Sequence, residues 1–525
     1  MSTRDENTAK PRYSRGRFLA SLGAGAAAVA GGGLVGPREG RAAGNAHSYA
    51  FVNTSSFTRI FGQLGSFANQ SPKVEAALKE LGKPGGLLDA KDLLSAGPVQ
   101  LITDPLLSTN NRNNPMHTAG TTFFGQFVDH DITFDTSSKM GKPTEPKDSP
   151  NGRTASLDLD SVYGGGPVAS SQLYEALDKA KLKVEFGGLF EDLPRASSDE
   201  TAILGDPRND EHVILAGLHC AFLKFHNNAV DALRVDGHPE AEVFGEARKL
   251  TTWHYQWLVL HEFLPLFVGQ PLVNTILTEG RKFYLPALGQ ALIPVEFQAA
   301  CYRFGHSMIR PSYRANLAGD DGQPFFGMIF DPDAGGDDPV DLRGGVRAPR
   351  RFVGWQTFFD FGGSFTAEVK PNKRIDTKLS TPLFNLPLGA IASHDPPTAL
   401  PQRTLLRHLT WKLPSGQQIA QAMGAPVLST QDLSELKSFG VGFERSTPLF
   451  YYILKEAELV EDGLQLGEVG GRIVAEVLIG LLQSDPASFV VAQPGWQPTL
   501  QNPGSSFRMV DFLRFAEVDP VSRGQ

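Results

Sequence analysis

Hydrophobic residues recur at helical spacing along several long stretches of the chain. Apolar side chains return every three or four positions in residues 211–234, 240–264 and 295–309, and again in residues 405–423 and 470–482. Shorter helical segments separated by Gly and Pro occupy the region before residue 115. Convincing alternation of apolar and polar residues is scarce, so the pattern predicts a mainly α fold.

Irregular segments separate the predicted helices. Residues 136–155 are polar and contain three prolines, which predicts a surface loop, and residues 313–380 are rich in glycine and aspartate. The 55 glycines and 37 prolines fit a helix-rich body with long loops and little β-structure. Neither an internal repeat nor a long linker is visible, and 525 residues are compatible with one large unit or with two fused ones.

The first 45 residues have a different character. Five basic residues before position 18 are followed by an apolar run of small residues at 18–36, which is typical of an export signal. Arg15 and Arg17 approximate a twin-arginine signal, but Gly16 lies between them, so Sec export is the alternative. Because glycine and alanine make the run only weakly hydrophobic, we expect cleavage rather than a retained anchor, and a secreted or periplasmic protein.

Charge and cysteine content argue against several classes of protein. The total net charge is −8; the first 45 residues contain seven basic and three acidic residues, a net +4, so the remainder carries −12. An acidic chain without a basic stripe does not favour nucleic-acid binding, and no later apolar run is long enough to span a bilayer. Cys220 and Cys301 lie in apolar helical contexts and predict buried free thiols rather than a disulfide framework.

The first candidate for chemistry is the segment GQFVDHD at residues 125–131. On a helix, Gln126, Asp129 and His130 stand at i, i+3 and i+4 and share one face, whereas Asp131 points to the side. One helical turn could therefore serve two sites.

The second cluster, TASLDLDSVYG at residues 154–164, alternates oxygen-bearing side chains with residues that can turn inward. Calcium prefers about six to eight oxygen ligands. Asp158, Asp160, Thr154 and a carbonyl near Ser156 fall short of that number, and Asp131 is the natural missing carboxylate. Taken alone, an Asp-x-Asp loop is more often a solvated turn.

The third cluster, GDPRNDE, leads directly into a predicted helix and places Arg208 and Glu211 three positions apart, where both can face one site. The alternative makes Asp206 or Asn209 a helix cap and Arg208 a surface ion-pair partner.

The fourth cluster is YRFGHSMIRP at residues 302–311. It places His306 inside an apolar helix, beside a glycine that would let a flat group approach the backbone. A lone helical histidine is more often a hydrogen-bonded core residue than a metal ligand.

In this order and at these spacings, the four clusters resemble the animal haem peroxidase (peroxidase–cyclooxygenase) superfamily, particularly its bacterial secreted, peroxinectin-like members. The resemblance covers most of residues 50–515 and implies a single helical haem peroxidase domain over residues 46–525. Four ordered matches are far more specific than any one of them.

The resemblance implies an enzyme that binds haem, reduces hydrogen peroxide and oxidises a halide, a pseudohalide or a small phenol. His130 matches the distal acid/base and Arg208 the distal cation. Gln126 would line the peroxide or halide pocket, and His306 matches the proximal ligand of the haem iron.

Further residues follow from the same resemblance. Asp129 and Glu211 match carboxylates that can form ester bonds with haem b. Arg303 belongs to the proximal motif, and Thr404 stands where the family usually has an asparagine beside the proximal histidine. His212 replaces a methionine that adds a sulfonium link in one specialised member, so iodide, bromide, thiocyanate or phenolic donors are favoured over chloride.

The resemblance also implies a calcium site. Its residues would be Asp131, Thr154, Ser156, Asp158 and Asp160, with Asp160 where a serine is common. Such a site would tie the His130 helix to a distant loop.

Two alternatives have different consequences. A fatty-acid dioxygenase of the same superfamily needs a tyrosine three residues before the proximal histidine, but Arg303 stands there, and Tyr302 is one position off, about 100° around a helix. A peroxinectin-type adhesion or matrix protein is the other alternative, although neither an integrin-type tripeptide nor an appended binding module is visible.

Overall fold

The computed structural model describes residues 55–135, 137–391, 393–500 and 506–525. The predicted export signal over residues 1–45 lies outside this part of the chain. Within the described residues, no helix combines the length and apolar character needed to cross a membrane.

Helices dominate the described chain, which confirms the predicted fold class. The helices of the first half are α2 (Pro72–Leu81), α3 (Gly97–Thr103), α4 (Gly120–Ile132), α5 (Asp160–Tyr163), α6 (Gly166–Ala169), α7 (Val213–Val235) and α8 (Glu240–Leu258). They are followed by α9 (Leu264–Val268), α10 (Gln270–Glu279), α11 (Val295–Ala299), α12 (Gly305–Met308), α13 (Leu400–Thr410), α14 (Gly416–Met423), α15 (Leu449–Val460), α16 (Glu468–Ser484), α17 (Phe489–Ala492) and α18 (Met509–Phe515).

The strands of the described chain are short and pair only two by two, antiparallel. They are β1 (Ser55–Ser56) with β3 (Pro150–Asn151), β2 (Asn113–Thr118) with β8 (Pro371–Lys373), β4 (Glu185–Phe186) with β5 (Glu191–Asp192), and β6 (Ser312–Arg314) with β7 (Phe326–Met328). The β2–β8 pair has a register shift between Asn114 and Thr118. These pairs join loops to one another and do not form a sheet core.

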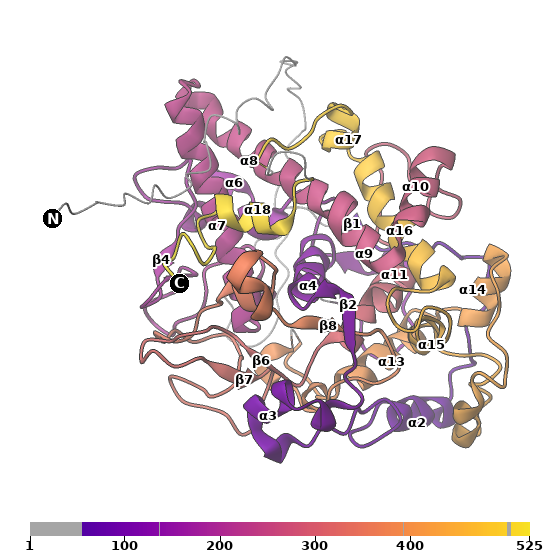
Figure 1. Cartoon of the computed structure of the whole chain (residues 1–525). Coiled ribbons are helices and arrows are strands. Elements are labelled where there is room, and N and C mark those ends of the chain that lie inside the picture. The colour runs from indigo at the N-terminus through magenta and orange to yellow at the C-terminus, as the bar shows by residue number, and fades with distance from the viewer. Residues whose placement is uncertain (1–54, 136, 392, 501–505) are drawn as a thin grey trace.

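Helix α4 lies in the middle of the molecule, surrounded by other helices (Figure 1). Most of its side chains are buried, and it contacts α7, α12 and β8. Glycine permits this close packing: a Cβ at Gly125 would lie 2.8 Å from the ring of Phe263, and one at Gly120 would lie 2.4 Å from the ring of Phe359. The first residue of the GQFVDHD motif is thus a packing requirement.

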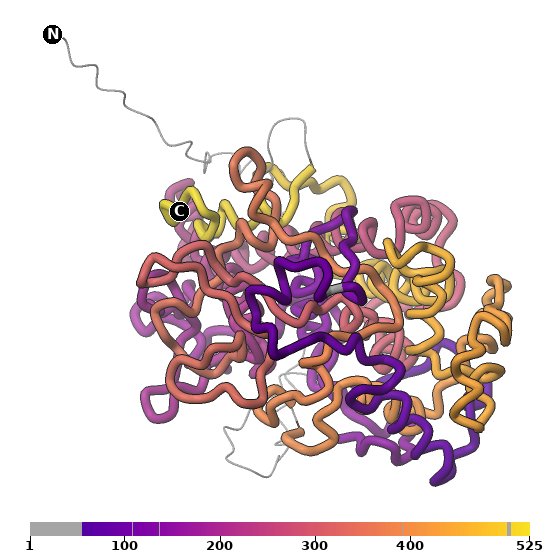
Figure 2. Tube along the Cα trace, turned by 60° about the horizontal axis from the view of Figure 1, so that its bottom comes forward, coloured from indigo at the N-terminus to yellow at the C-terminus, as the bar shows by residue number. Residues whose placement is uncertain are grey.

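Segments far apart in the sequence form one body around α4. Helix α2 contacts α13, and α18 contacts α7. In Figure 2 the indigo start of the described chain runs beside orange segments from its second half. Helices α7 and α8 form the most extensive helix pair, and most of the buried hydrophobic residues form a single continuous core.

Two predicted helices lie at the predicted positions, but only one of them is continuous. The helix predicted over 240–264 is continuous because a five-residue π-helix (Val259–Phe263) joins α8 to α9. The helix predicted over 405–423 is two helices, α13 and α14, separated by Lys412 at a φ of 47° and by Pro414.

The helix predicted over 295–309 is wrong as a single element. The chain forms α11, leaves helical geometry at Ala300 (φ −138°, ψ −68°), makes a 3-10 turn over Cys301–Phe304 and then forms α12. Apolar residues run through all three pieces, so hydrophobic spacing does not reveal the break. His306 therefore lies in a short helix directly after a tight turn.

The loop predicted on the surface over 136–155 is exposed in much of its length, but its end is buried. Asn151 and Arg153 are buried because their side chains bind polar groups of the interior: Asn151 bonds to the backbone of Ile132 and Phe134, and Arg153 to Asp206. Both cysteines are buried and unbridged, as predicted.

Candidate active site

His130 is held by a buried chain of polar side chains. Its Nδ1 lies 2.9 Å from Asn209 Oδ1, and Asn209 Nδ2 lies 3.0 Å from His219 Nδ1. Burial, followed by the positive charge of Arg208, lowers the pKa of His130 to about 3, so its imidazole is neutral. In this arrangement Nδ1–H donates to Asn209, and Nε2 keeps a lone pair that can accept a proton.

Arg208 is anchored next to the end of α4. Its Nε and Nη2 donate to Asp206 at 3.0 and 2.7 Å, and Nη2 also donates to the carbonyls of His130 and Thr133. The guanidinium lies 4.2 Å above the ring of Phe134. Within the described residues, Nη1 of Arg208 donates no hydrogen bond, so its N–H groups can donate to a ligand.

Asp206 joins Arg208 to the rest of the interior. Burial alone would raise the pKa of this carboxyl, but Arg153 and Arg208 bind it and hold its pKa far below the usual range. Asp206 also caps the 3-10 turn over Pro207–Asp210 by accepting from the Arg208 backbone N–H. The helix cap and the Arg208 ion pair, which the sequence suggests as alternatives to an active-site role, are both present. The ion pair is buried, however, and not on the surface.

Gln126 and Glu211 meet beside the start of α7. Gln126 Nε2 donates to Glu211 Oε2 at 3.1 Å, and Gln126 Oε1 lies 2.9 Å from His212 Nε2. Burial raises the pKa of Glu211 to about 8. Asp129, on the same face of α4 as Gln126, accepts a hydrogen bond from the hydroxyl of Thr133 at 3.1 Å.

His306 has the arrangement expected of a metal-binding histidine. Its Nδ1 lies 3.4 Å from Thr404 Oγ1, and the Thr404 hydroxyl donates to Leu400 O at 3.1 Å. Since that hydroxyl hydrogen is used, Thr404 accepts from Nδ1–H and Nε2 is left as an acceptor. Burial, together with Arg303 and Arg407, lowers the pKa of His306 to about 3. A neutral imidazole is the form that binds iron.

Arg303, in the His306 segment, interacts electrostatically with residues of the His130 region. Its Nε donates to Gln298 O at 2.8 Å, and burial and Arg407 lower its pKa to about 9. Asp129 and Arg208 both contribute to the electrostatic field at Arg303, and α12 contacts α4. The fold therefore brings the His306 segment and the His130 segment to one region.

Several side chains of this region keep surface that protein atoms do not cover. Gln126, Asp129, Arg208, Glu211, Arg303 and His306 all keep accessible surface although most of their neighbours are buried. For Glu211, His306 and Arg303, burial is nonetheless the largest cause of the pKa shift. A Cβ at Gly305 would meet no atom within 4 Å, so open space lies beside His306. These side chains include the donor set that a haem requires, and we call the space among them the candidate cavity.

Three carboxylates form a second cluster behind α4. Oxygen atoms of Asp131, Asp158 and Asp160 all lie within 4.8 Å of one another. Burial and repulsion from Asp160 raise the pKa of Asp158 to about 7, and burial and repulsion from Asp158 and Asp160 raise the pKa of Asp131. Burial also raises the pKa of Asp160, which Arg153 opposes. Carboxylates that repel one another in a buried site are suited to a divalent cation.

Thr154 and Ser156, the other residues of the predicted calcium site, have different hydrogen-bond partners. The Thr154 hydroxyl is 2.8 Å from Asp158 Oδ1 and 3.3 Å from Asp160 Oδ2, so it belongs to the carboxylate cluster. The Ser156 hydroxyl instead donates to Asp485 at 2.6 Å. Only the backbone carbonyl of Ser156 is left as a candidate ligand.

Several residues of the site have no role in the sequence-based prediction. The sequence pattern indicates Asn209 only as a helix cap and indicates no role for His219 or Arg153. One signal was available: His212, His219 and His226 are spaced by seven residues and therefore share a face of α7. Arg153 offers no local signal, because its partners Asp160 and Asp206 come together only in the fold.

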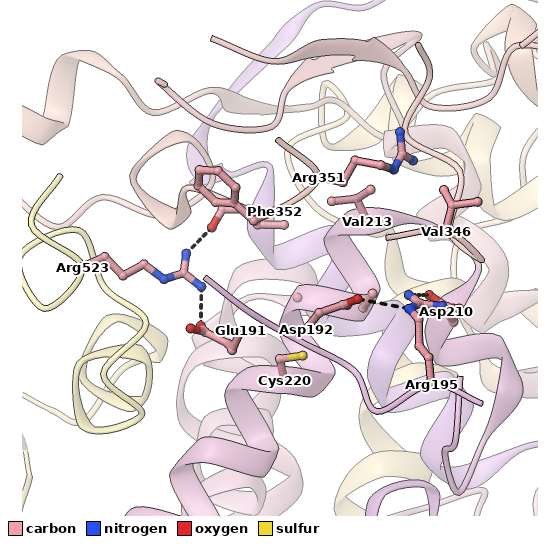
Figure 3. A pocket seen from close by; sticks show the side chains of 14 residues that line it. Glu191, Asp192, Arg195, Asp210, Val213, Cys220, Val346, Arg351, Phe352 and Arg523 are labelled. Atoms are coloured by element: carbon pink, nitrogen blue, oxygen red, sulfur yellow. Dashed lines mark hydrogen bonds and ion pairs between the residues drawn. The ribbon is translucent and has the colours of Figure 1, made fainter. Parts of the chain in front are cut away.

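A separate cavity lies on another face of α7, at Cys220 (Figure 3). Its volume is about 20 Å³, room for little more than one water molecule. Arg523 with Glu191, and Arg195 with Asp192 and Asp210, form ion pairs around it. Burial raises the pKa of the Cys220 thiol, which keeps it protonated and unreactive. This cavity is structural.

Solved structures share the fold. Peroxidase A from Dictyostelium discoideum aligns with a TM-score of 0.60 at 14% identity, over 88% of this chain and 93% of that protein. The fatty-acid α-dioxygenase of Oryza sativa aligns with a TM-score of 0.52 at 13% identity, over 88% of this chain and 85% of that one. The described chain therefore has the all-helical fold of this peroxidase, which the dioxygenase shares.

Sequence comparison identifies the family of one part of the chain. Residues 137–333, which include Arg208, Glu211 and His306, match the animal haem peroxidase family. The human protein named probable oxidoreductase PXDNL is 30% identical over 245 residues, which are 40% of this chain and 16% of that protein. Residues 137–333 therefore carry an animal haem peroxidase domain, and the chain spans about a sixth of the length of this human relative.

Proposed function

We propose that this protein is a haem-dependent peroxidase that reduces hydrogen peroxide and oxidises a halide, a pseudohalide or a small phenol. The observation that carries the proposal is the pairing of two neutral histidines, His130 and His306, whose Nδ1 atoms are both bonded so that both Nε2 atoms are free. The match to the animal haem peroxidase family supports the same activity.

The distal residues have separate tasks in this proposal. His130 Nε2 accepts a proton from one peroxide oxygen and returns it to the leaving oxygen, as a neutral imidazole can near neutral pH. Arg208 Nη1 donates to the oxygen on which negative charge develops, and Asp206 holds the guanidinium in place. Gln126 supplies a further N–H from one turn earlier on α4.

The proximal residues hold the cofactor. His306 Nε2 would bind the iron, and a bound haem supplies the two-electron oxidising chemistry on which the reaction depends. Thr404 accepts weakly from His306 at 3.4 Å, and Arg303 and Arg407 place positive charge nearby. Both features reduce electron donation from the imidazole compared with an asparagine partner in a neutral setting.

Two further proposals concern covalent attachment and calcium. Asp129 and Glu211 both keep accessible surface in the candidate cavity, where their carboxyl groups could form esters with haem methyl groups. Asp131, Thr154, Asp158, Asp160 and the Ser156 carbonyl would bind calcium, with Arg153 balancing the additional charge of Asp160. Export by the signal in residues 1–45, to the periplasm or beyond the cell, belongs to the same proposal.

The dioxygenase alternative has the fold in its favour but lacks its key residue. Arg303 holds the position three residues before His306. The neighbouring Tyr302 stacks on Phe297 at 4.5 Å, and its hydroxyl has no hydrogen-bond partner among the described residues. A tyrosine releases its hydroxyl proton when it is oxidised to a tyrosyl radical, and no acceptor for that proton is present in this part of the chain, which favours peroxidase over dioxygenase. An adhesion role remains compatible with either activity.

The absorption spectrum of the purified protein tests the proposal. We expect a Soret band that is retained on acid-acetone extraction if the esters form, and that is lost or altered in His306→Ala. A protein purified from a haem-sufficient host without any Soret band would contradict the proposed function. Conversion of a fatty acid to a hydroperoxide in the absence of halide would favour the dioxygenase alternative.

A further inference from the structure

His212 connects the N-terminus of α7 to α4. Its ring is buried, with 2% of its surface exposed, and packs edge-on against Phe123, whose centroid is 5.2 Å away. Nδ1 of His212 accepts from the backbone N–H of Leu215 at 3.2 Å, which caps the helix. Nε2 lies 2.9 Å from Gln126 Oε1.

The position of the single hydrogen on this ring follows from these contacts. Burial lowers the pKa of His212 to about 3, so the imidazole is neutral and carries one N–H. Because a backbone N–H can only donate, Nδ1 is the acceptor and the hydrogen is on Nε2. Nε2–H therefore donates, and the atom that it meets on Gln126 must be the amide oxygen.

The orientation of the Gln126 amide is fixed as a result. Its oxygen accepts from His212, and one hydrogen of its Nε2 goes to Glu211 Oε2. The second hydrogen has no recorded partner in the described part of the chain. Since Gln126 is half-buried and precedes His130 by one turn on the same face of α4, this free N–H is available to a small ligand bound beside His130.

We infer that His212 is a positioning residue that holds the Gln126 amide with an N–H toward the cavity, and so adapts the pocket to small ligands that accept a hydrogen bond, anions above all. A rotated amide would set its NH₂ group against His212 Nε2–H, donor against donor. The inference rests on the proposed function, because the pocket is the one assigned to peroxide and its co-substrate.

Glu211 cannot fix the amide alone. Its pKa is raised to about 8 by burial, so near neutral pH its carboxyl is largely protonated and can donate as well as accept. Either orientation of Gln126 would then find a partner on Glu211. Only His212, whose hydrogen is fixed by a backbone group, distinguishes the two.

Two substitutions separate this role from helix capping. Asn at position 212 retains an acceptor for the Leu215 N–H but is too short to reach Gln126, whereas Gln is long enough to donate to it. The matched control is His226→Ala, because His226 is also buried in α7 but bonds to Tyr163 and Ala180. The probe is thiocyanate, with its dissociation constant measured from the Soret band of protein loaded with haem that acid-acetone still extracts, so that Glu211 is a free carboxyl and not an ester.

We expect His212→Asn to weaken thiocyanate binding by about tenfold or more, the value of one hydrogen bond to a charged ligand. His212→Gln should recover most of that affinity, and His226→Ala should bind as the wild type does. Equal thiocyanate affinity in the wild type and His212→Asn would overturn the inference, as would an equal loss in His226→Ala.

The wild-type preparation distinguishes failure of this inference from failure of the proposed function. A wild-type protein that binds haem and reacts with peroxide supports the function even if His212→Asn binds thiocyanate normally, and only the positioning role is then lost. A wild-type protein without haem contradicts the function and this inference together.

Discussion

At the scale of single residues, the site depends on which nitrogen of each histidine carries hydrogen. The GQFVDHD, GDPRNDE and YRFGHSMIRP segments predict the candidate reactive residues from the sequence alone. Their hydrogen-bond partners could not be predicted, because His130 and Asn209 are 79 positions apart and Thr404 is 98 positions from His306. Only the fold brings such pairs into contact, and these contacts set the tautomers on which proton transfer depends.

Asn209 provides a test at this scale. Replacing it with Leu removes the acceptor for His130 Nδ1–H, so the ring can rotate or change tautomer, and we expect the rate of reaction with peroxide to fall about ten- to a hundredfold. Asn227→Leu is the matched control, since Asn227 lies in α7 and bonds only to the backbone of Leu182. An unchanged rate in Asn209→Leu would exclude the positioning role of Asn209.

The pH profile of Asn209→Asp gives a second readout. An aspartate keeps the acceptor, but its charge stabilises imidazolium and raises the pKa of His130 from its value of about 3. The base must be neutral to accept a proton, so the acid limb of the rate profile should move to higher pH. Stopped-flow rates between pH 4 and pH 8 would measure this shift, and a limb at the wild-type position would contradict it.

At the scale of elements, long periodic helices were predictable and breaks in them were not. Helix α7 is found where a period of three or four predicted it, with His212 as its cap. The break at Ala300 lies inside an uninterrupted apolar run, so no local signal marks it. Two-stranded pairs such as β2–β8 join residues more than 250 positions apart, and strands this short lack a recognisable alternation.

The contact between α15 and α16 makes stability depend on pH. The carboxylate of Glu456 in α15 accepts from the backbone N–H groups of Val469 and Gly470 at the start of α16. Burial nevertheless raises its pKa to about 7. The pKa of Glu456 in the folded state is above its pKa of about 4.5 in the unfolded state. Protonation of Glu456 therefore contributes fully to the stability of the folded state below pH 4.5, and this stabilisation is lost as the pH rises through 7.

Glu456→Gln should remove this dependence, because the neutral amide retains an acceptor. Relative to the wild type, the free energy of unfolding of the variant should increase by on the order of 3 kcal/mol between pH 4.5 and pH 8. Thermal denaturation of both proteins at several pH values measures it. A difference that is constant with pH would show that Glu456 keeps an ordinary pKa.

At the scale of the whole molecule, the carboxylate cluster joins distant parts of the chain. Asp131 belongs to the central helix α4, and Asp158 and Asp160 belong to the loop before and the start of α5. Ser156 ties that loop to Asp485 at the end of α16, and Arg153 ties it to Asp206 beside Arg208. A cation at this point would stabilise the geometry of His130 and Arg208 from behind.

Removal of calcium tests this connection. We expect chelation to lower the melting temperature and to slow the reaction with peroxide, with recovery on adding calcium. Saturation at 100 times the dissociation constant is worth about 2.7 kcal/mol. Asp158→Asn should weaken the response, whereas Asp333→Asn, on an exposed loop, should leave it intact. Equal melting temperatures with calcium and with chelator would contradict a calcium site.

In the proposed mechanism, His130 transfers the proton when peroxide reacts with a haem bound by His306. The decisive measurement is rapid mixing of hydrogen peroxide with haem-loaded wild type, His130→Ala and the control His226→Ala, followed at the Soret band. The wild type and the control should react fast, and His130→Ala should retain haem but react two to four orders of magnitude more slowly, roughly the range of general acid–base catalysis. A His130→Ala protein that retains haem and reacts at the wild-type rate would contradict this mechanism.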